Sequence, residues 1–299
     1  MRGESVGLFI LIVQGFLTVT FFFSSLVFYS LSARVLPSPR WVDQSVLLFI
    51  YNPAAAHFTA IYTESVYTLL CFLVQWLYLR NVSSHRRVSL LPISLLVAAM
   101  CLLRSNSVLV PLLFSLPLLL KANCFWLDAS WVALSVLPLL LYLLHFAREY
   151  CPVTSSSPLR VLFACGGKTV YSHVEQKYWS VGLFGYYRYN HIPDFLIATP
   201  TVLLCVSTLW TATKRVVRER KWALVPLLLH LTAVTAICLT VANVQIITRM
   251  VLSNSPLFVW HVAALLQRGG VSMKKALLVY WLGYFCVGTA AFSLFLPWT

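Results

Sequence analysis

Three short polar sequences, each at the edge of an apolar run, carry the residues best suited to chemistry. They are Tyr62-Thr63-Glu64-Ser65, Arg104-Ser105-Asn106, and Gln245 with Arg249. Ionisable groups beside apolar segments are costly, so they are usually paired or functional. An arginine guanidinium binds phosphate well because its planar fork donates two hydrogen bonds. If the three sequences meet, Glu64, Arg104 and Arg249 would surround a cavity for an anionic lipid phosphate.

Helix packing is a plainer explanation for the same residues. Glu64 is the only carboxylate between Asp43 and Asp128, and it could pair with an arginine simply to hold two helices together. His57 also lies within an apolar run, where a single histidine is typical of a packing residue. The pattern of residues leaves both explanations open.

A second candidate surface lies in the polar segment 147–194. Tyr178 and Trp179 follow Lys177 there, and Tyr186-Tyr187 comes soon after. Aromatic rings beside cations suit a sugar or a lipid headgroup. They equally suit a helix that lies in the membrane interface, and composition favours the interface.

Several classes of site and partner are not indicated. The sequence has no glycine-rich phosphate loop, zinc-ligand spacing or nucleophile elbow. The net charge of +14 comes from Lys and Arg in short clusters between apolar runs, so it does not predict nucleic-acid binding. Six of the eight cysteines lie in or beside apolar runs as small hydrophobes, whereas Cys151 and Cys165 lie in the 147–194 segment.

The composition predicts an all-α polytopic membrane protein. Hydrophobic residues make up 60% of the chain and charged residues 10%, against about 25% charged in a soluble domain. In lipid only a helix satisfies its own backbone, and it needs roughly 17 to 25 apolar residues to span. We expect eight or nine membrane segments in a single transmembrane domain, 1–299, with some of the short segments that begin at 65, 88 and 106 as half-helices or re-entrant pieces. The candidate spans are 6–31, 42–62, 65–79, 88–103, 106–120, 124–146, 195–213, 222–247 and 276–296.

Basic residues predict the orientation, because they favour the cytoplasmic side of short loops. The strongest cluster is Lys214, Arg215, Arg218, Arg220 and Lys221. Placing it in the cytoplasm puts the C-terminus there too, with Arg34, Arg40, Arg80, Arg86, Arg87 and Lys121. Residues 147–194 then form the main lumenal loop and 248–275 a second lumenal connection. The three polar sequences also lie on the lumenal side.

Several motifs, in order, resemble the family of glycosylphosphatidylinositol (GPI) mannosyltransferase 2, also called phosphatidylinositol-glycan class V. They are Asn52-Pro53-Ala54, Tyr62-Thr63-Glu64-Ser65, Arg104-Ser105-Asn106, Tyr178-Trp179-Ser180-Val181-Gly182, Val244-Gln245 with Thr248-Arg249, and Phe295-Leu296-Pro297-Trp298-Thr299. Each motif is weak alone. Together they support the resemblance, because they occur in the family's order and on consistent predicted sides of the membrane. The similarity extends from about Val6 to the last residue.

The resemblance implies a lumen-facing glycosyltransferase of the GT-C type in the endoplasmic reticulum membrane. Such an enzyme takes mannose from dolichol-phosphate-mannose and adds it, through an alpha-1,6 linkage, to a mono-mannosylated GPI precursor lipid. No metal or other cofactor is implied, and a small membrane partner subunit is a further candidate partner. A disulfide between Cys151 and Cys165 is implied as well. The substrate-binding residues would be Glu64, Arg104, Asn106, Tyr178, Trp179, Gln245 and Arg249.

The chain departs from that family in lacking the Trp-Asp motif, whose Asp is the expected general base, and the Phe-Phe-Pro stretch that accompanies it. Glu64 is then the fallback catalytic carboxylate. Because the orientation also places Met1 in the lumen, we expect an incomplete gene model or fragment that is inactive alone. Two other functions stay open: a catalytically silent membrane subunit or paralogue of GPI assembly, and a small-molecule transporter, which would also have short, broken helices.

Overall fold

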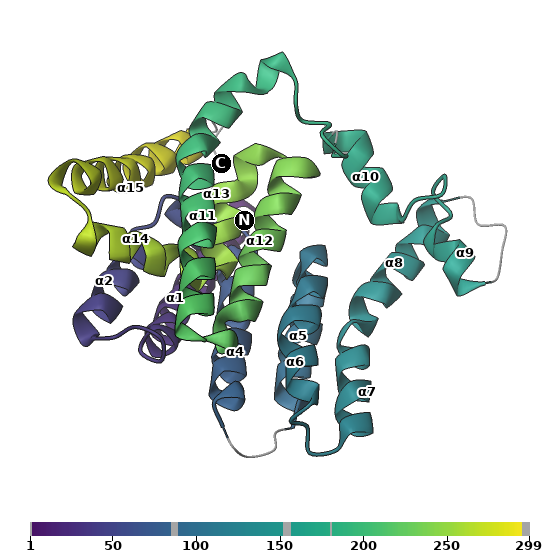
Figure 1. Cartoon of the computed structure of the whole chain (residues 1–299). Coiled ribbons are helices and arrows are strands. Elements are labelled where there is room, and N and C mark those ends of the chain that lie inside the picture. Colours follow the sequence, from purple (N-terminus) through teal and green to yellow (C-terminus); the bar gives the residue numbers. More distant parts are fainter. Residues whose placement is uncertain (1, 85–88, 152–156, 180, 295–299) are drawn as a thin grey trace.

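A computed structural model describes residues 2–84, 89–151, 157–179 and 181–294. Within these ranges every regular element is a helix, apart from one isolated β-bridge between Cys165 and Lys168 (Figure 1). Three features of the sequence lie outside the described residues: the Arg86-Arg87 pair, Ser180, and the C-terminal motif from Phe295 to Thr299.

The helices follow one another with short connections. The first half of the chain forms α1 (Arg2–Ser32), α2 (Pro39–Ile50), α3 (Ala55–Thr59), α4 (Glu64–Val82), α5 (Leu91–Leu103), η1 (Ser105–Val108), η2 (Pro111–Ser115), α6 (Leu116–Leu119), α7 (Phe125–Ser135) and α8 (Leu137–Tyr150). The second half forms α9 (Pro158–Leu162), α10 (Val170–Trp179), η3 (Tyr189–His191), α11 (Ile192–Glu219), η4 (Trp222–Leu224), α12 (Val225–Thr240), η5 (Val244–Ile246), α13 (Ile247–Asn254), α14 (Pro256–Arg268) and α15 (Val271–Ser293).

Five helical stretches of the described chain are long and apolar enough to cross a membrane. They are Val6–Ser32, Phe125–Tyr150, Tyr189–Glu219, Trp222–Thr240 and Val271–Ser293. A sixth candidate is the pair Val244–Asn254 and Pro256–Arg268, which is bent by 89°. The protein is therefore a multi-pass helical membrane protein, as expected, but the predicted count of eight or nine segments is not confirmed.

Two expected spans end early, the first of them for a local reason. In the expected span 42–62, α2 stops at Ile50, where the Asn52 side chain donates to the Phe49 carbonyl (2.7 Å) and accepts from the Ala54 amide (2.8 Å). An Asn side chain that bonds its own backbone competes with the helix, and the following proline cannot continue it. The expected span 222–247 likewise ends at Thr240.

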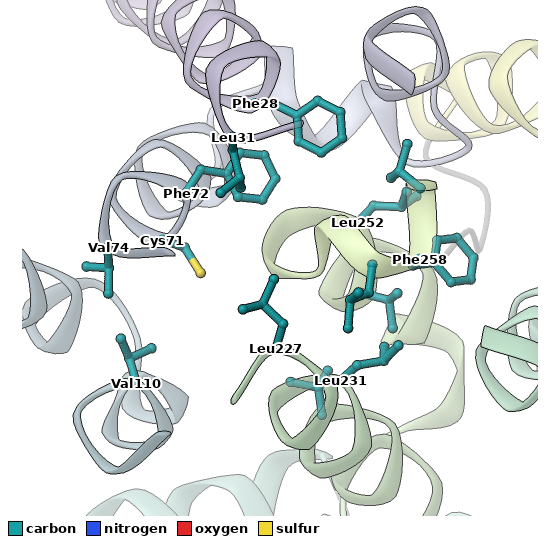
Figure 2. Close-up of a cluster of buried hydrophobic side chains, with 14 of the residues drawn as sticks. Phe28, Leu31, Cys71, Phe72, Val74, Val110, Leu227, Leu231, Leu252 and Phe258 are labelled. Carbon is teal, nitrogen blue, oxygen red and sulfur yellow. The ribbon is translucent and has the colours of Figure 1, made fainter. Parts of the chain in front are cut away.

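Helices α1 and α4 pack side by side and run in the same direction, and their contacts define two ends of the bundle. The Ser24 hydroxyl donates to the Ser65 carbonyl (3.3 Å) near one end, and the Arg34 guanidinium lies 5.1 Å from the centre of the Trp76 ring near the other. Between these contacts lies an apolar core, in which side chains from α1, α4, α12, α13 and α14 converge (Figure 2). We refer below to the Glu64 end and the Trp76 end of the bundle.

The segment 248–275 does not stay at one end of the bundle. Arg249 lies at the Glu64 end, 3.7 Å from that carboxylate, whereas Arg268 stacks over Trp41 at the start of α2. Between them, the Trp260 indole donates to the Ser32 hydroxyl at the end of α1 (2.8 Å). The bent pair α13–α14 thus runs from one end of the bundle to the other, which disagrees with the expected simple lumenal connection.

This crossing also reverses the direction expected for α15. From α14 onward, Trp281 donates to the Leu48 carbonyl (3.0 Å), and Phe292 packs against Tyr62 (ring centres 5.8 Å apart). Helix α15 therefore ends at the Glu64 end. If that end is lumenal, α15 ends in the lumen and not in the cytoplasm, because the bent pair adds a crossing that a count of long apolar runs misses.

Within the segment 147–194, the end of α8 with α9 and α10 forms an arm beside the bundle, and the last residues of the segment begin α11 (Figure 1). Its own small core holds Ala147, Cys151, Val161, Cys165 and Val170, and Cys151 and Cys165 are joined by a disulfide there. After α10 the chain returns to the bundle, where the amides of Gly182 and Phe184 donate to the carbonyls of Val241 (3.1 Å) and Thr240 (2.6 Å). Its lumenal side stays a prediction.

Candidate functional site

Glu64, Arg104 and Arg249 meet at one end of the bundle, as their types and spacing predicted. Glu64 occupies the first turn of α4, where a carboxylate interacts favourably with the helix dipole, and its side chain is wholly buried. Arg104 forms an ion pair with it, and the Arg249 Nη1 lies 3.7 Å from the same Oε1 atom. Two cations thus share one carboxylate, which leaves one positive charge in excess.

Arg104 is held by its backbone and by three further side chains. It ends α5 in an extended conformation (φ −152°, ψ 139°), after which the chain tightens into η1. Its Nε donates to the Thr63 hydroxyl (3.2 Å), one guanidinium nitrogen lies 3.5 Å from the Met250 sulfur, and the group lies over the Tyr67 ring, 5.1 Å from its centre. The Arg104 side chain is 16% exposed. Its guanidinium is therefore fixed in place and still accessible.

Arg249 is held in a similar way, by contacts made from α13. It lies in the first turn of α13, directly after η5, and its guanidinium carbon is 5.8 Å from the centre of the Tyr62 ring. Its side chain is 24% exposed. Both arginines thus contact the polar sequence 62–65 through Glu64, Arg104 also through the Thr63 hydroxyl and Arg249 also through the Tyr62 ring.

A cavity of about 640 Å³ opens beside this cluster. Arg104, Asn106, Trp179 and Arg249 line it, and Glu64 does not. Its other walls come from the ends of α5 and α12, from α8 and α10, and from the turn that carries η5; they are largely apolar: Leu102, Leu103, Leu139, Ile237, Val241 and Ile246. The cavity therefore combines a cationic edge with an apolar wall, which suits a lipid that carries an anionic group.

Two buried donors of the cavity lining have no hydrogen-bond partner among the described residues. They are the Asn106 Nδ2 and the Arg249 Nε. A buried donor without a partner costs about 1–3 kcal/mol, so such groups in a cavity favour a ligand with several acceptor oxygens. A phosphate provides those oxygens.

Helix α10 contributes two residues that sequence reasoning missed. Tyr171 and Glu175 line the cavity with Trp179, one helical turn apart from each other. Burial raises the pKa of the Tyr171 hydroxyl to about 12, and the neighbouring Ser105 acts in the opposite direction. Partial burial also raises the pKa of the Glu175 carboxyl, although the neighbouring Tyr171 hydroxyl acts in the opposite direction. The signal was present in the sequence: residues at i, i+4 and i+8 share one face of a helix.

Gln245 and Tyr178, two other predicted site residues, lie outside the cavity lining. The Gln245 Oε1 accepts a hydrogen bond from the Tyr186 hydroxyl (2.7 Å), which also donates to Asp194. His191 completes this group, with its Nδ1 3.0 Å from Asp194. Gln245 thus holds the end of the arm against η5. Tyr178 is 67% exposed beside Lys177, which fits an interfacial ring.

In the described part of the chain, no group of three or more His, Cys, Asp or Glu side chains lies close enough together to hold a metal ion. His57, the lone histidine of the α3 segment, is buried, and its ring packs edge-on against Tyr62 and Phe292. It contributes to packing at the Glu64 end of the bundle.

Comparison with known proteins gives a consistent family. The family model described as "Mannosyltransferase (PIG-V)" matches residues 5–299. The chain is similar to GPI mannosyltransferase 2 of Yarrowia lipolytica, at 30% identity over 82% of this chain and 64% of that relative. It is also similar to GPI mannosyltransferase 2 of Drosophila pseudoobscura pseudoobscura (26%; 91% of this chain, 71% of the relative) and to GPI alpha-1,6-mannosyltransferase 2 of Rattus norvegicus (23%; 92% and 74%).

The matched region thus spans about two thirds of the length of these relatives. No solved structure matches the chain.

Proposed function

Because this chain belongs to the mannosyltransferase (PIG-V) family, whose model matches residues 5–299, we propose that it transfers mannose from dolichol-phosphate-mannose to the mono-mannosylated GPI precursor. The new linkage is alpha-1,6, as in the name of the rat relative. The reaction takes place in the endoplasmic reticulum membrane, at the lumenal end of the bundle.

The observation that carries the proposal is the cavity with two arginines around one buried carboxylate. The excess positive charge at Arg104 and Arg249 attracts the donor phosphate, and the low dielectric beside the membrane strengthens that attraction. Both guanidinium groups are held in place by aromatic rings before any ligand arrives. Such preorganised donors stabilise charge that develops during a reaction.

The charge that develops here is on the leaving group. An acceptor hydroxyl oxygen forms a bond to C1 of the mannose, and the bond from C1 to the phosphate oxygen breaks. The electron pair of that bond leaves with the dolichyl phosphate, whose negative charge increases as it departs. Arg104, Arg249 and the unpartnered Nδ2 of Asn106 would bind that phosphate.

The apolar wall of the cavity suits the rest of the donor. Leu102 and Leu139 face the same space as Ile237 and Val241, from helices that lie on different sides of it. A lipid chain laid against them keeps its hydrocarbon away from water while its phosphate reaches the arginines. Trp179 gives the sugar an aromatic surface in the same cavity.

The chain should restore GPI-anchored proteins at the surface of cells that lack the second GPI mannosyltransferase. Microsomes from those cells should transfer labelled mannose from dolichol-phosphate-mannose to the mono-mannosylated precursor. We propose that transfer needs no metal, so EDTA should leave the rate unchanged. No transfer, with the chain present in the membrane at the level of an active relative, would reject the activity. Donor binding without transfer would favour a catalytically silent lipid-binding subunit.

A further inference from the structure

The turn between α12 and η5 brings a hydrogen-bond acceptor to the cavity. The side-chain Oδ1 of Asn243 is buried in the cavity lining and has no hydrogen-bond partner among the described residues. Resting on the proposed function, we propose that Asn243 is a specificity-determining residue whose Oδ1 accepts a hydrogen bond from a hydroxyl of the donor mannose. Through this bond the cavity distinguishes the mannose-bearing donor from dolichyl phosphate alone.

The Asn243 side chain does not make the bond that its position ordinarily favours. Asparagine is common directly before a helix, because its side-chain oxygen accepts from the first unpaired amides of that helix. Asn243 occupies this place before η5, yet its side chain makes no capping hydrogen bond. Its oxygen therefore does not stabilise the turn, and a partner for it has to come from the cavity.

The main chain holds Asn243 in place before a ligand arrives. The Ile246 amide donates to the Asn243 carbonyl across η5 (3.2 Å). From the arm side, the Gly182 amide donates to the Val241 carbonyl, two residues earlier (3.1 Å). A polar group on a fixed turn needs little ordering when a ligand binds, so its hydrogen bond contributes more of its strength to recognition.

The unpartnered atoms of the described cavity lining require two kinds of ligand atom. Asn106 Nδ2 and Arg249 Nε are donors, and the oxygens of a phosphate satisfy them. Asn243 Oδ1 is an acceptor, so it needs a hydrogen that the ligand supplies. An ionised phosphate diester and a hydrocarbon chain have no such hydrogen, whereas each free hydroxyl of mannose has one. The mannose is therefore the part of the donor that matches Asn243.

The covalent structure of the donor places its mannose beside the phosphate. C1 of the sugar is bonded directly to a phosphate oxygen, so the ring lies next to the phosphate wherever the phosphate binds. Asn243 and Arg249 lie on either side of η5, a single short turn, and both line the cavity. A phosphate-binding cation and a sugar-binding acceptor thus face adjoining parts of one ligand.

The arginines alone do not select the donor over the lipid product. Arg104 and Arg249 attract a lipid phosphate whether or not it carries mannose, and dolichyl phosphate has the greater negative charge. Asn243 is paired by the mannose of the donor and left unpaired by the product. Leaving a buried acceptor unpaired weakens binding by about 5- to 100-fold, so this one bond favours the donor by a similar factor.

Competition binding to the chain in lipid nanodiscs tests the assignment. Short-chain dolichol-phosphate-mannose and short-chain dolichyl phosphate are each used to displace a radiolabelled donor, and the ratio of their affinities gives the preference for the mannose-bearing lipid. We expect Asn243→Leu to reduce that preference by about 5- to 100-fold and to leave the affinity for dolichyl phosphate within about twofold. Leucine is close to asparagine in size, so the cavity keeps its shape.

Two matched substitutions separate sugar recognition from general damage. Asn190→Leu, at an exposed position of η3 outside the cavity lining, should leave both affinities unchanged. Asn106→Leu removes a donor to the phosphate, so it should weaken the binding of both lipids and preserve the preference between them. The pattern expected for Asn243→Leu differs from both.

A series of donors that each lack one hydroxyl of the mannose identifies the group that Asn243 binds. With the unmodified chain, one of these donors should bind about 5- to 100-fold more weakly than the complete donor. With Asn243→Leu that difference should disappear, because the hydroxyl has already lost its partner. A packing role alone predicts additive effects of the substitution and of the missing hydroxyl.

The outcomes separate this inference from the proposed function. If the unmodified chain binds neither lipid, the proposed function fails and this inference fails with it. If it binds both lipids and Asn243→Leu keeps the preference for the mannose-bearing one, Asn243 does not recognise the sugar. Equal weakening of both lipids by Asn243→Leu, or additive effects throughout the series of donors, would also overturn the assignment and leave Asn243 with a structural role.

Discussion

Arg104 is ion-paired to Glu64, and the Glu64 carboxylate is wholly buried while Arg104 keeps 16% of its side chain exposed. The pair joins the end of α5 to the start of α4, and Arg249 adds a third charge from α13. The Glu64 carboxylate therefore keeps the two guanidinium groups close together at the edge of the cavity.

Glu64→Gln should destabilise the protein, because it leaves Arg104 and Arg249 near each other without a counter-charge. Removing one partner of a buried ion pair typically costs about 3–5 kcal/mol. Thermal unfolding in detergent, followed by a thiol-reactive dye, would measure the shift. Glu149→Gln, an exposed position on α8, should change stability by no more than about 0.5 kcal/mol. Equal melting of the two variants would mean that the Glu64 pair does not stabilise the fold.

Arg104→Ala and Arg249→Ala should each lower mannose transfer strongly without removing the protein from the membrane. The loss of one preorganised donor at a charged transition state typically costs about 10²- to 10³-fold. The Arg→Lys variants should fall between, because lysine keeps the charge but loses the planar fork. Arg188→Ala, an exposed position of the arm outside the cavity lining, is the control. Full activity in both alanine variants would leave these arginines with a packing role alone.

Replacing Cys151 and Cys165 with serine should loosen the arm without unfolding the bundle, because the arm has its own small core. In the chain-entropy picture, a bridge across 14 residues contributes about 3 kcal/mol. Limited proteolysis of permeabilised microsomes should then cut near α9 sooner than in the unmodified chain. Mannose transfer should fall as well, since α10 carries the cavity-lining residues Glu175 and Trp179. Unchanged cleavage and activity would show that the disulfide is dispensable for placing α10.

Single cysteines can test the two ends of the bundle in sealed microsomes, after the exposed Cys124 and Cys286 have been replaced by alanine. We expect Ser172→Cys and Ser293→Cys to be protected from an impermeant reagent added outside. Arg218→Cys and Val271→Cys should react, because Val271 follows Arg268 and its contact with Trp41. If Ser293→Cys reacts from the cytoplasmic side while Ser172→Cys does not, the crossing by α13 and α14 is wrong.

Much of the site could be predicted because its residues are unusual in their setting. Glu64, Arg104 and Arg249 are ionisable groups beside apolar runs, and such groups need partners wherever they fold. Their meeting could be predicted because an unpaired charge beside an apolar run is costly. The turns that carry them were also predicted to lie on the same side of the membrane. Gln245 is a polar but uncharged group in the same setting, and it bonds Tyr186 in the arm. A polar residue in such a place indicates that a partner exists, and it does not say which one.

The class of protein and its polar clusters are determined by the sequence itself. Apolar runs must form helices in lipid, where the backbone has no other hydrogen-bond partner. Glu175 lay in a segment whose composition indicated only an interface, and it became a cavity residue because the residues after α10 bond the end of α12, which brings α10 to the same cavity as Ser105. The direction of α15 depended on the bend between α13 and α14, which is set by packing against α1 and α2. Only the tertiary structure decided these points, because they depend on contacts between segments far apart in the chain, which local composition and spacing do not encode.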